Sequence, residues 1–419
     1  MQSQVKVIFY FLVFVVILQP LIGLLLFNLS DQQFFINYFP VIKDLLIFSI
    51  FSLMMLYTLI VSKINKEHLK LYSLFFLFIL IMTISFFLSE SNLYFKLYNL
   101  RRILILYIIF FSFHGLFFGY GFTSIKNFII GISLFICLFG LIEYFLPDYF
   151  WDEWLSLPKY WNNDTQGLEI ESIKQTGRGY TSDLYFLYKK KFRRMLSVFL
   201  EPSTLGSFFS YIFAFFYFSN KFNYKKIFLI LILLCGMMVF SKIFILSILL
   251  IIAIDYFRMN LKLIFLGMTP LLIFLGYTVT NSTFIHGSFS HIVGVYTGFE
   301  IAMNKLFGMG LGMAGNRPMN PSTNIVNGEN GAESGFGNVV AQIGVGGLII
   351  SIILYLLMVR SYKIYKLSGN SDYLGISAMI LVYYLNYNLS ASSLALSGNF
   401  IVFILAGVYL NRGVLMKKI

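Results

Sequence analysis

The chain has little charge and little cysteine, and each shortage excludes a class of protein. Charged residues make up only 12% of the 419 residues, whereas hydrophobic residues make up 58%. A soluble fold of this length could not bury so much apolar surface, so the composition predicts a protein that crosses a membrane many times. The two cysteines, Cys137 and Cys235, both lie in apolar runs. This position argues against a disulfide framework and for small buried side chains.

Metal-binding patterns are also scarce. His286 and His291 lie five residues apart, and no HExxH or cysteine pattern accompanies them in the sequence, so we expect no metal and no other cofactor. The net charge of +13 would suit nucleic acid, but most basic residues lie in short connections between apolar runs. That distribution is typical of membrane topology, so we expect membrane lipids around the chain and no nucleic-acid partner.

Runs of about 20 apolar residues predict an all-α polytopic membrane protein with about 12 transmembrane helices in one domain, 1–419. The predicted spans are 7–27, 41–62, 71–89, 103–121, 127–146, 196–219, 226–241, 243–257, 262–279, 336–358, 374–390 and 395–411. The first run is too long for a signal-peptide core and has no small-residue cleavage site, so we expect it to be retained. The seventh and eighth runs are short and nearly continuous, as in one broken helix or a tight hairpin.

Basic residues follow alternate spans, which predicts that both termini lie in the cytoplasm. Two long polar stretches, 147–195 and 280–335, then both face the periplasm or another extracytoplasmic space. Loops of this length are uncommon in a compact bundle and usually carry function. The first contains all three tryptophans, Trp151, Trp154 and Trp161. Their rings suit either stacking on sugars or the aromatic belt at a membrane surface.

Charged residues stand at the ends of several apolar runs. The chain re-enters an apolar run through Arg194–Gly206, in which Glu201 directly precedes Pro202. An arginine here suits bidentate phosphate contact, and the alternative is a helix start whose arginine reaches lipid headgroups. Lys242, between two short runs, either lies in an outward hairpin or has a functional role.

Two further groups lie in or beside the outward loops. Arg101 and Arg102 open a predicted span on the outward side, where they suit either an anion clamp or an interfacial anchor. The second loop contains Gly308, Gly310 and Gly312. Their backbone could approach a phosphate closely, and it could equally form a flexible turn.

Three stretches, in this order, resemble the O-antigen polymerase and O-antigen ligase superfamily of bacterial envelope glycosyltransferases. Arg194–Gly206 resembles the family's R-x-x-S-x-F-x-E-P-x-x-x-G segment, and Phe240–Lys242 resembles its Ser-Arg or Ser-Lys element. Phe307–Gly312 and Glu333–Leu348 resemble its glycine loop and the helix that follows. Ligases usually carry a His-Asn pair where this chain has Glu333 and Ser334, and this departure favours the polymerases.

The resemblance implies a metal-independent glycosyltransferase that polymerises oligosaccharide repeat units. It would join undecaprenyl-diphosphate-linked units into O-antigen or capsule at the outer face of the bacterial inner membrane. A chain-length regulator and a flippase of the same pathway would be its partners. The alternatives are an O-antigen ligase, which transfers polymer to lipid A-core, and a lipid-linked oligosaccharide flippase, which is a transporter.

The resemblance also implies roles for single residues. Cations must stabilise the departing diphosphate, and a base must accept the proton of the attacking sugar hydroxyl. The candidate diphosphate partners are Arg194, Lys242 and Arg317, with Arg101 and Arg102 added for their position. The candidate catalytic groups are Glu333 or Glu201 as the base, together with Arg194. The candidate sugar contacts are Trp151, Trp154 and Trp161.

Overall fold

A computed structural model describes residues 2–29, 45–57, 60, 66–115, 122–147, 149–157, 159–160, 193–220, 222–281, 289–315 and 333–412. Every regular element within these ranges is helical. The α-helices are α1 (Gln2–Leu29), α3 (Lys66–Leu88), α4 (Leu93–Gly115), α5 (Phe122–Phe145), α9 (Pro202–Phe218), α10 (Lys225–Met238), α11 (Lys242–Phe257), α12 (Leu261–Thr280), α13 (Ser290–Asn304), α14 (Gly335–Ile343), α15 (Gly346–Ser368), α16 (Ser371–Leu389) and α17 (Leu396–Arg412), with an unlabelled helix over Leu45–Tyr57. Short elements are the π-helix η1 (Phe150–Trp154) and the 3₁₀ helices η2 (Ser197–Phe199) and η6 (Ala391–Leu394).

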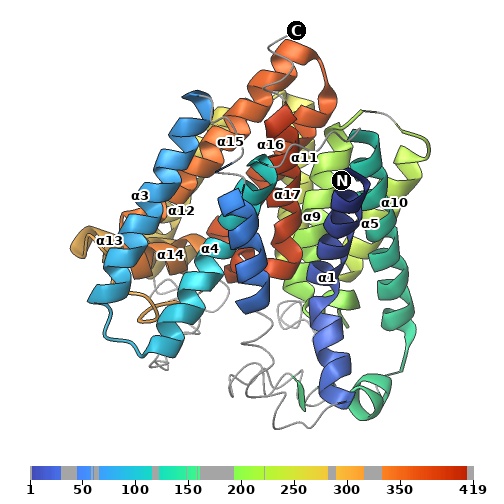
Figure 1. Cartoon of the computed structure of the whole chain (residues 1–419), viewed down its shortest axis with the longest axis horizontal. Coiled ribbons are helices and arrows are strands. Elements are labelled where there is room, and N and C mark those ends of the chain that lie inside the picture. The colour runs from blue at the N-terminus through green and yellow to red at the C-terminus, as the bar shows by residue number, and fades with distance from the viewer. Residues whose placement is uncertain are drawn as a thin grey trace.

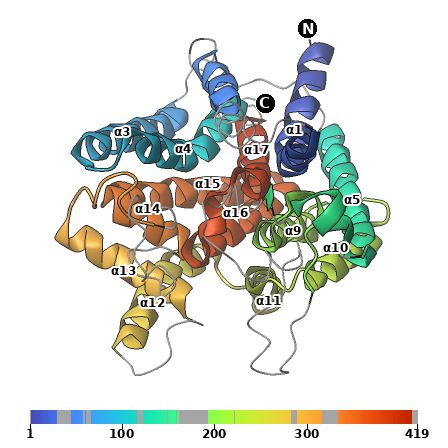
Figure 2. The same ribbon diagram turned by 90° about the horizontal axis from the view of Figure 1, so that it is seen from below.

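The centre of the bundle is formed by α16 and α17 (Figure 1 and Figure 2). Helix α16 packs against α9 and α15, and α17 packs against α4 and α9. Glycines allow the close approaches, as small residues do between membrane helices. A Cβ at Gly398 in α17 would lie 2.8 Å from the carbonyl oxygen of Thr204, and one at Gly375 in α16 would lie 2.5 Å from that of Phe215. The start of α9 therefore meets the start of α17, and the end of α9 meets the start of α16.

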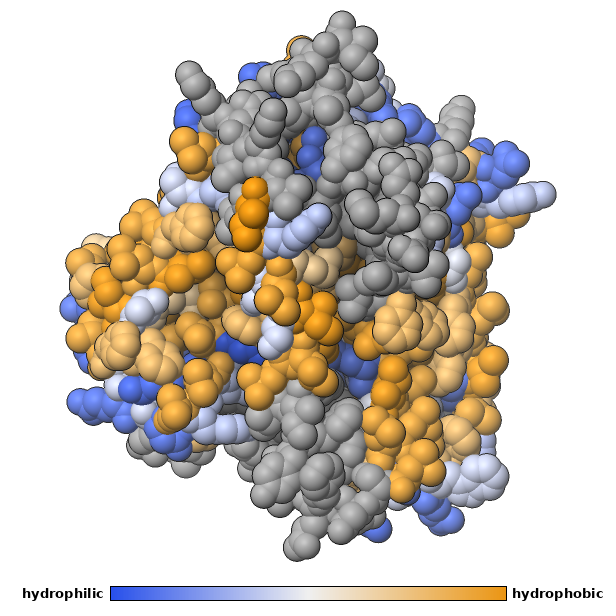
Figure 3. Space-filling view, in the orientation of Figure 1, coloured by the Kyte–Doolittle hydropathy of each residue, from blue (hydrophilic) through white to orange (hydrophobic). Residues whose placement is uncertain are grey.

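Five of the described helices are long and apolar enough to cross a membrane. They are the segments Leu69–Leu88, Leu93–His114, Ser124–Phe145, Leu261–Thr280 and Gly346–Ser368. Figure 3 shows apolar side chains across the middle of one face, with hydrophilic side chains gathered towards its upper and lower parts. An all-helical bundle with such a surface has the character of a membrane protein.

The predicted spans all fall on helices, but their number and lengths differ from the prediction. Helices α9, α10, α11 and α17 have only 14 to 17 residues, so 12 full-length spans are not confirmed. The single span predicted over 336–358 is wrong, because α14 ends at Ile343 and α15 begins at Gly346. Gly344 breaks the helix with a φ of +59°, and a Cβ there would collide with the carbonyl oxygen of Leu306.

Within the second predicted loop, 280–335, the described residues include a helix that was not predicted from the sequence. This helix, α13, packs against α12 and α14. The periodicity of this helix is short and interrupted by glycines, which explains why a search for long apolar runs missed it. Of the first predicted loop, 147–195, most residues lie outside the described ranges.

A buried ion pair fixes the end of the bundle at which α16 begins. Lys126 of α5 donates to the Asp372 carboxylate over 2.9 Å, and both side chains are less than a tenth exposed. Lys126 also donates to the carbonyl oxygen of Asn220, whose own N–H donates to Asp372 over 2.9 Å. Asn370 caps α16 by accepting from the N–H of Asp372. The ends of three helices are thus joined by buried polar contacts.

Candidate functional site

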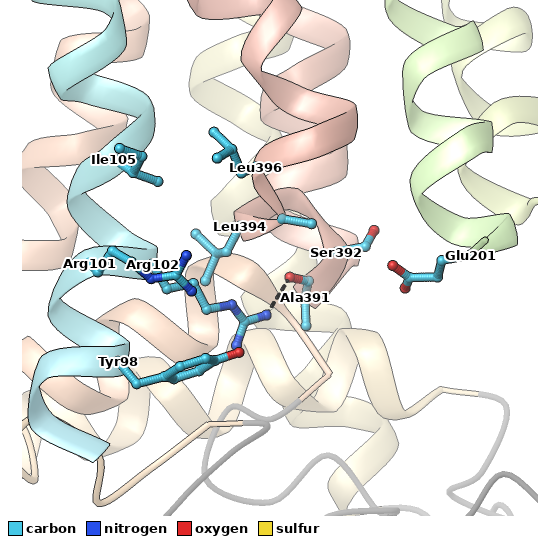
Figure 4. Close-up of a pocket in the computed structure, with 10 residues that line it drawn as sticks. Tyr98, Arg101, Arg102, Ile105, Glu201, Ala391, Ser392, Leu394 and Leu396 are labelled. Carbon is cyan, nitrogen blue, oxygen red and sulfur yellow. Dashed lines mark hydrogen bonds between the residues drawn. The ribbon is translucent and has the colours of Figure 1, made fainter. Parts of the chain in front are cut away.

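A cavity of about 240 Å³ lies at the other end of the bundle, where α9 and α17 begin. Three elements form its walls: α4, the first residue before α9, and η6 with the start of α17 (Figure 4). The lining residues are Tyr98, Arg101, Arg102, Ile105, Glu201, Ala391, Ser392, Leu394, Ala395 and Leu396. Three residues singled out in the sequence, the two arginines and Glu201, therefore share one cavity although about a hundred residues separate them.

The arginines come from inside a helix. The predicted span began at residue 103, but α4 begins at Leu93, ten residues earlier, because the helix continues through polar and aromatic residues that a search for apolar runs leaves out. Arg102 donates through Nη2 to the carbonyl oxygen of Ala391 over 3.0 Å. The Arg101 guanidinium lies over the ring of Tyr98, 5.3 Å from its centre. Both arginines are half-buried at the cavity. This setting suits the binding of an anion better than it suits anchoring at the membrane surface.

Glu201 faces the arginines from α9 across the cavity (Figure 4). It is the extended N-cap residue of α9, and Pro202 supplies the first helical residue, where its missing N–H is harmless. Its two carboxylate oxygens accept from the hydroxyls of Ser203 and Thr204, each over 2.5 Å. These bonds hold the carboxylate at the mouth of the helix. The positive ends of α9 and α17 lie at the same cavity and favour negative charge there.

The third wall, η6, is held in place by a network of buried side chains. Asn399 donates to the carbonyl oxygens of Ser392 and Ala395 over 2.8 and 2.7 Å. Its own amide oxygen accepts from the Tyr211 hydroxyl over 2.6 Å, and Tyr211 in turn contacts Asn386. The network ties α9, α16 and α17 to η6. Buried polar networks of this kind rigidify what they hold when their members are satisfied.

Glu333 lies behind η6 and not on the cavity wall. Its backbone carbonyl accepts from the N–H of Ala391 over 3.1 Å, on the residue whose carbonyl binds Arg102. The next residue, Ser334, caps α14 and donates to the carbonyl oxygen of Asn388. The Glu333 carboxylate lies 3.5 Å from Nδ1 of His291, and about a third of each side chain is exposed. Glu333 and Arg102 thus bind the same residue, Ala391, one at its N–H and the other at its carbonyl oxygen.

Two of the cations expected at the diphosphate, Arg194 and Lys242, do not line the cavity. Arg194 donates through Nε to the carbonyl oxygen of Val239 over 3.0 Å, at the end of α10. Lys242 is the exposed first residue of α11, after a turn in which Phe240 has a φ of +49°. The seventh and eighth runs are therefore two helices separated by a turn. A Cβ at Gly206 would collide with the side chain of Ser241, so the first two sequence motifs do lie against each other.

The glycine loop packs against protein. Gly308, Gly310 and Gly312 all have positive φ, a conformation that favours glycine, and Cβ atoms on them would lie 2.5 to 2.8 Å from atoms of Gln342, Ser89 and Ser91. The N–H of Gly312 donates to the Gln342 side chain over 2.8 Å, and that of Gly310 donates to the Gln342 carbonyl over 3.0 Å. The close approach expected of these glycines is therefore to α14 and to the corner between α3 and α4.

The tryptophans differ sharply in their surroundings. Trp151 is 1% exposed and packs with Leu24, Leu196 and Leu200, so its ring has no face open to a sugar. Trp154, three residues on, is 69% exposed. Trp161 and the candidate cation Arg317 lie outside the described residues.

Some residues of the site escaped the sequence analysis. Tyr98 and Ser392 line the cavity, and the only sequence signal for η6 was the short serine-rich interruption at 390–393 between two apolar runs. Outside the cavity, Glu143 also escaped the sequence analysis, although a lone acidic residue within the predicted apolar span 127–146 is itself a signal.

No cluster of three histidine, cysteine, aspartate or glutamate side chains suited to a metal occurs among the described residues, and metal independence stays a prediction. No protein-family model, curated protein or solved structure matches the chain. What can be said about function therefore depends on the cavity and its residues.

Proposed function

We propose that this chain is a membrane glycosyltransferase that joins polyprenyl-diphosphate-linked oligosaccharide units into a polysaccharide. The observation that carries the proposal is the convergence of Arg101, Arg102 and Glu201 on one cavity at the end of an apolar helical bundle. Two guanidinium groups on one wall and a carboxylate on the opposite wall match the two needs of the reaction. The resemblance of the sequence motifs to the polymerase and ligase superfamily points in the same direction.

The reaction divides between the two walls. The bond between the anomeric carbon of the donor sugar and its diphosphate breaks, and the diphosphate leaves with its lipid. Arg101, Arg102 and the positive ends of α9 and α17 stabilise the negative charge that develops on this leaving group. The oxygen of an acceptor sugar hydroxyl forms the new bond to the anomeric carbon, and Glu201 accepts its proton.

The size of the cavity supports this division. A volume of about 240 Å³ is smaller than the roughly 300–1,000 Å³ of pockets that enclose a drug-sized ligand. It therefore suits the reacting groups alone: the diphosphate, the donor sugar and one acceptor hydroxyl. The remaining sugars and the lipid chain extend beyond the walls, as a polymerising enzyme requires of a product that lengthens at every turn.

The finer topology belongs to the same proposal. About 12 membrane crossings, cytoplasmic termini and a site facing outward from the inner membrane would give the enzyme its lipid-linked substrate after a flippase has delivered it. Glu333, held against Ala391, is a second candidate base, and Arg194, Lys242 and Arg317 stay candidate contacts for parts of the substrate outside the cavity.

Deletion of the gene, followed by gel analysis of surface polysaccharide, tests the proposal. A polymerase predicts a single repeat unit on the lipid A-core, where the parent strain shows a ladder. Lipid-linked polymer beside a bare core would replace the proposal with a ligase, and precursor trapped on the cytoplasmic side would replace it with a flippase. Purified protein in lipid vesicles with lipid-linked repeat units should then produce the ladder without added nucleotide sugar.

A further inference from the structure

Glu143 is a buried acidic residue on the face of α5 that packs against residues 195–197, and the charge of Arg193 acts on it. It lies near the end of α5, within a segment apolar enough to cross a membrane, and only 1% of it is exposed. An ionisable side chain inside such a segment is expensive to bury, and where one occurs it is a functional candidate by default. It does not line the cavity.

The Glu143 carboxylate binds the backbone of a turn far away in the sequence. Oε2 accepts from the N–H of Leu196 over 2.9 Å and from that of Ser197 over 3.2 Å. The Ser197 hydroxyl donates to the carbonyl oxygen of Ile136, about two turns before Glu143 on α5. Gly140 lies between these contacts, and a Cβ there would meet Met195 at 2.7 Å and Ser197 at 3.1 Å. One face of α5 is thus shaped to hold residues 195–197.

The turn itself has an uncommon backbone. Ser197 and Leu200 have φ values of +49° and +57°, in the left-handed region that residues with a side chain rarely adopt. Left-handed residues of this kind persist only where surrounding contacts fix them. The other side of the turn is held by α10, since the N–H of Met195 donates to Met238 and Arg194 donates to Val239.

This turn ends directly at Glu201. Glu201, whose carboxylate lies on the cavity wall, is the fourth residue after Ser197, whose N–H donates to Glu143. We propose that Glu143 is a positioning residue: its buried carboxylate fixes the left-handed turn and thereby holds Glu201 at the cavity. The effect on turnover rests on the proposed function, whereas the effect on geometry does not.

Two substitutions separate the acceptor from the charge. Glu143→Gln keeps an oxygen that can accept both backbone N–H groups, and Glu143→Leu has a similar size but no acceptor. Gly140→Ala displaces the same turn by a methyl group without touching Glu143, and it replaces the leucine variant if that one does not fold.

The first measurement follows position alone. Cysteines introduced by Glu201→Cys and Ser392→Cys, on facing walls, are crosslinked with thiol reagents of graded length in the full chain in detergent. The native Cys137 and Cys235 are buried, and variants with one introduced cysteine give the background. We expect the same preferred length and yield in the Gln background as in the parent, and at least a several-fold lower yield with a broader length range in the Leu or Ala background. An unchanged profile in those backgrounds would overturn the proposal.

The second measurement uses polymerisation kinetics with Glu201 intact. We expect Glu143→Leu to lower kcat by about 100-fold, because a displacement of about 1 Å can cost that much, while KM changes by less than a few-fold. Glu143→Gln should rescue kcat to within a few-fold of the parent. If the parent protein itself polymerises nothing, while Glu143→Leu still shifts the crosslinking profile, the positioning role stands and the proposed function is removed. A shifted profile with normal kcat would mean that the position of Glu201 does not matter, which overturns the proposal.

Discussion

The two ends of the bundle use the same kinds of charged residue in opposite ways. Where α16 begins, Lys126 and Asp372 lie 2.9 Å apart, almost fully buried, and the backbone of Asn220 hydrogen-bonds to both. Where α9 begins, Arg101, Arg102 and Glu201 are half-buried around a cavity. The first set joins helices to one another away from this cavity, whereas the second set lines it, although Arg102 also binds the carbonyl oxygen of Ala391.

The difference shows how a structural charge can be told from a functional one in a membrane bundle. Both sets are ionisable residues in or directly beside apolar helices, and sequence position alone gives them the same weight. At the ion pair the partners are protein atoms, so removing one partner should disturb folding. At the cavity the support comes from surrounding groups, such as Ser203 and Thr204 around Glu201, so removing the charge should disturb chemistry and leave folding intact.

The largest effect is expected at Glu201. Glu201→Gln keeps the size of the side chain and removes the base, so the rate of polymerisation per folded molecule should fall by about 10²–10⁴-fold. The unfolding midpoint in detergent should stay within about 2 °C of the parent, because glutamine keeps the size of the side chain and can still hydrogen-bond to Ser203 and Thr204. The matched control is Glu300→Gln, an exposed acidic residue of α13, which should leave the rate unchanged. A full rate in Glu201→Gln would move the base to Glu333, where Glu333→Gln then repeats the test.

Arg102 should give the next largest effect. Arg102→Gln removes a cation from the proposed diphosphate, and loss of one such group lowers kcat by about 10²–10³-fold. The substitution also removes the hydrogen bond from Arg102 to Ala391, which is worth only about 1 kcal/mol net, so stability should change little. Arg258→Gln, at an exposed helix end, is the control. If Arg102→Gln lowers expression and the unfolding midpoint while Arg258→Gln does not, and the rate per folded molecule of Arg102→Gln is normal, Arg102 belongs with the structural charges.

The residues of the cavity also show what the sequence could and could not predict. Arg101, Arg102 and Glu201 stood out because charges at the ends of apolar runs are rare. The cavity that they share could not be predicted, because it depends on η6 and on the packing of α4 against α17. Arg194 was expected at the diphosphate, yet the structure directs it to the carbonyl oxygen of Val239, 45 residues away. A local pattern cannot distinguish a guanidinium that binds a ligand from one that binds a distant carbonyl.

The same limit applies to the fold: local patterns predicted the helices, but not the features that depend on distant contacts. The apolar runs located nearly every helix, since burial in a bundle or membrane needs long apolar segments. The break at Gly344 was missed because its cause, the carbonyl oxygen of Leu306, is supplied by a loop 38 residues earlier. Helix α13 was missed because packing on α12 and α14, and not its own apolar content, stabilises it.

The ion pair at the other end should show the reverse of the Arg102 result. Lys126→Met leaves the buried Asp372 without its cation, and breaking a buried pair typically costs about 3–5 kcal/mol. We expect the lower limit, about 3 kcal/mol, because the N–H of Asn220 still binds the carboxylate. The rate per folded molecule should be normal. The double variant Lys126→Met with Asp372→Leu should recover part of the lost stability, and a normal unfolding midpoint in the single variant would contradict the structural role.

The smallest effect concerns the glycine loop, and it sharpens the comparison because this motif looked like a ligand site in the sequence. Gly310 has a φ of +98°, and a Cβ there would lie 2.7 Å from the Cα of Ser89; Gly369 has a φ of +67° in open space. Alanine at Gly369 should cost about 1 kcal/mol, the price of a left-handed alanine alone. Alanine at Gly310 should cost about 1–3 kcal/mol more, because it also overpacks a tight contact. Unfolding in detergent measures both, and the polymerisation rate per folded molecule should be equal in the two variants. A Gly310→Ala protein as stable as Gly369→Ala but with a raised KM for the lipid-linked unit would instead make the loop part of the substrate site, and would extend the functional region beyond the cavity.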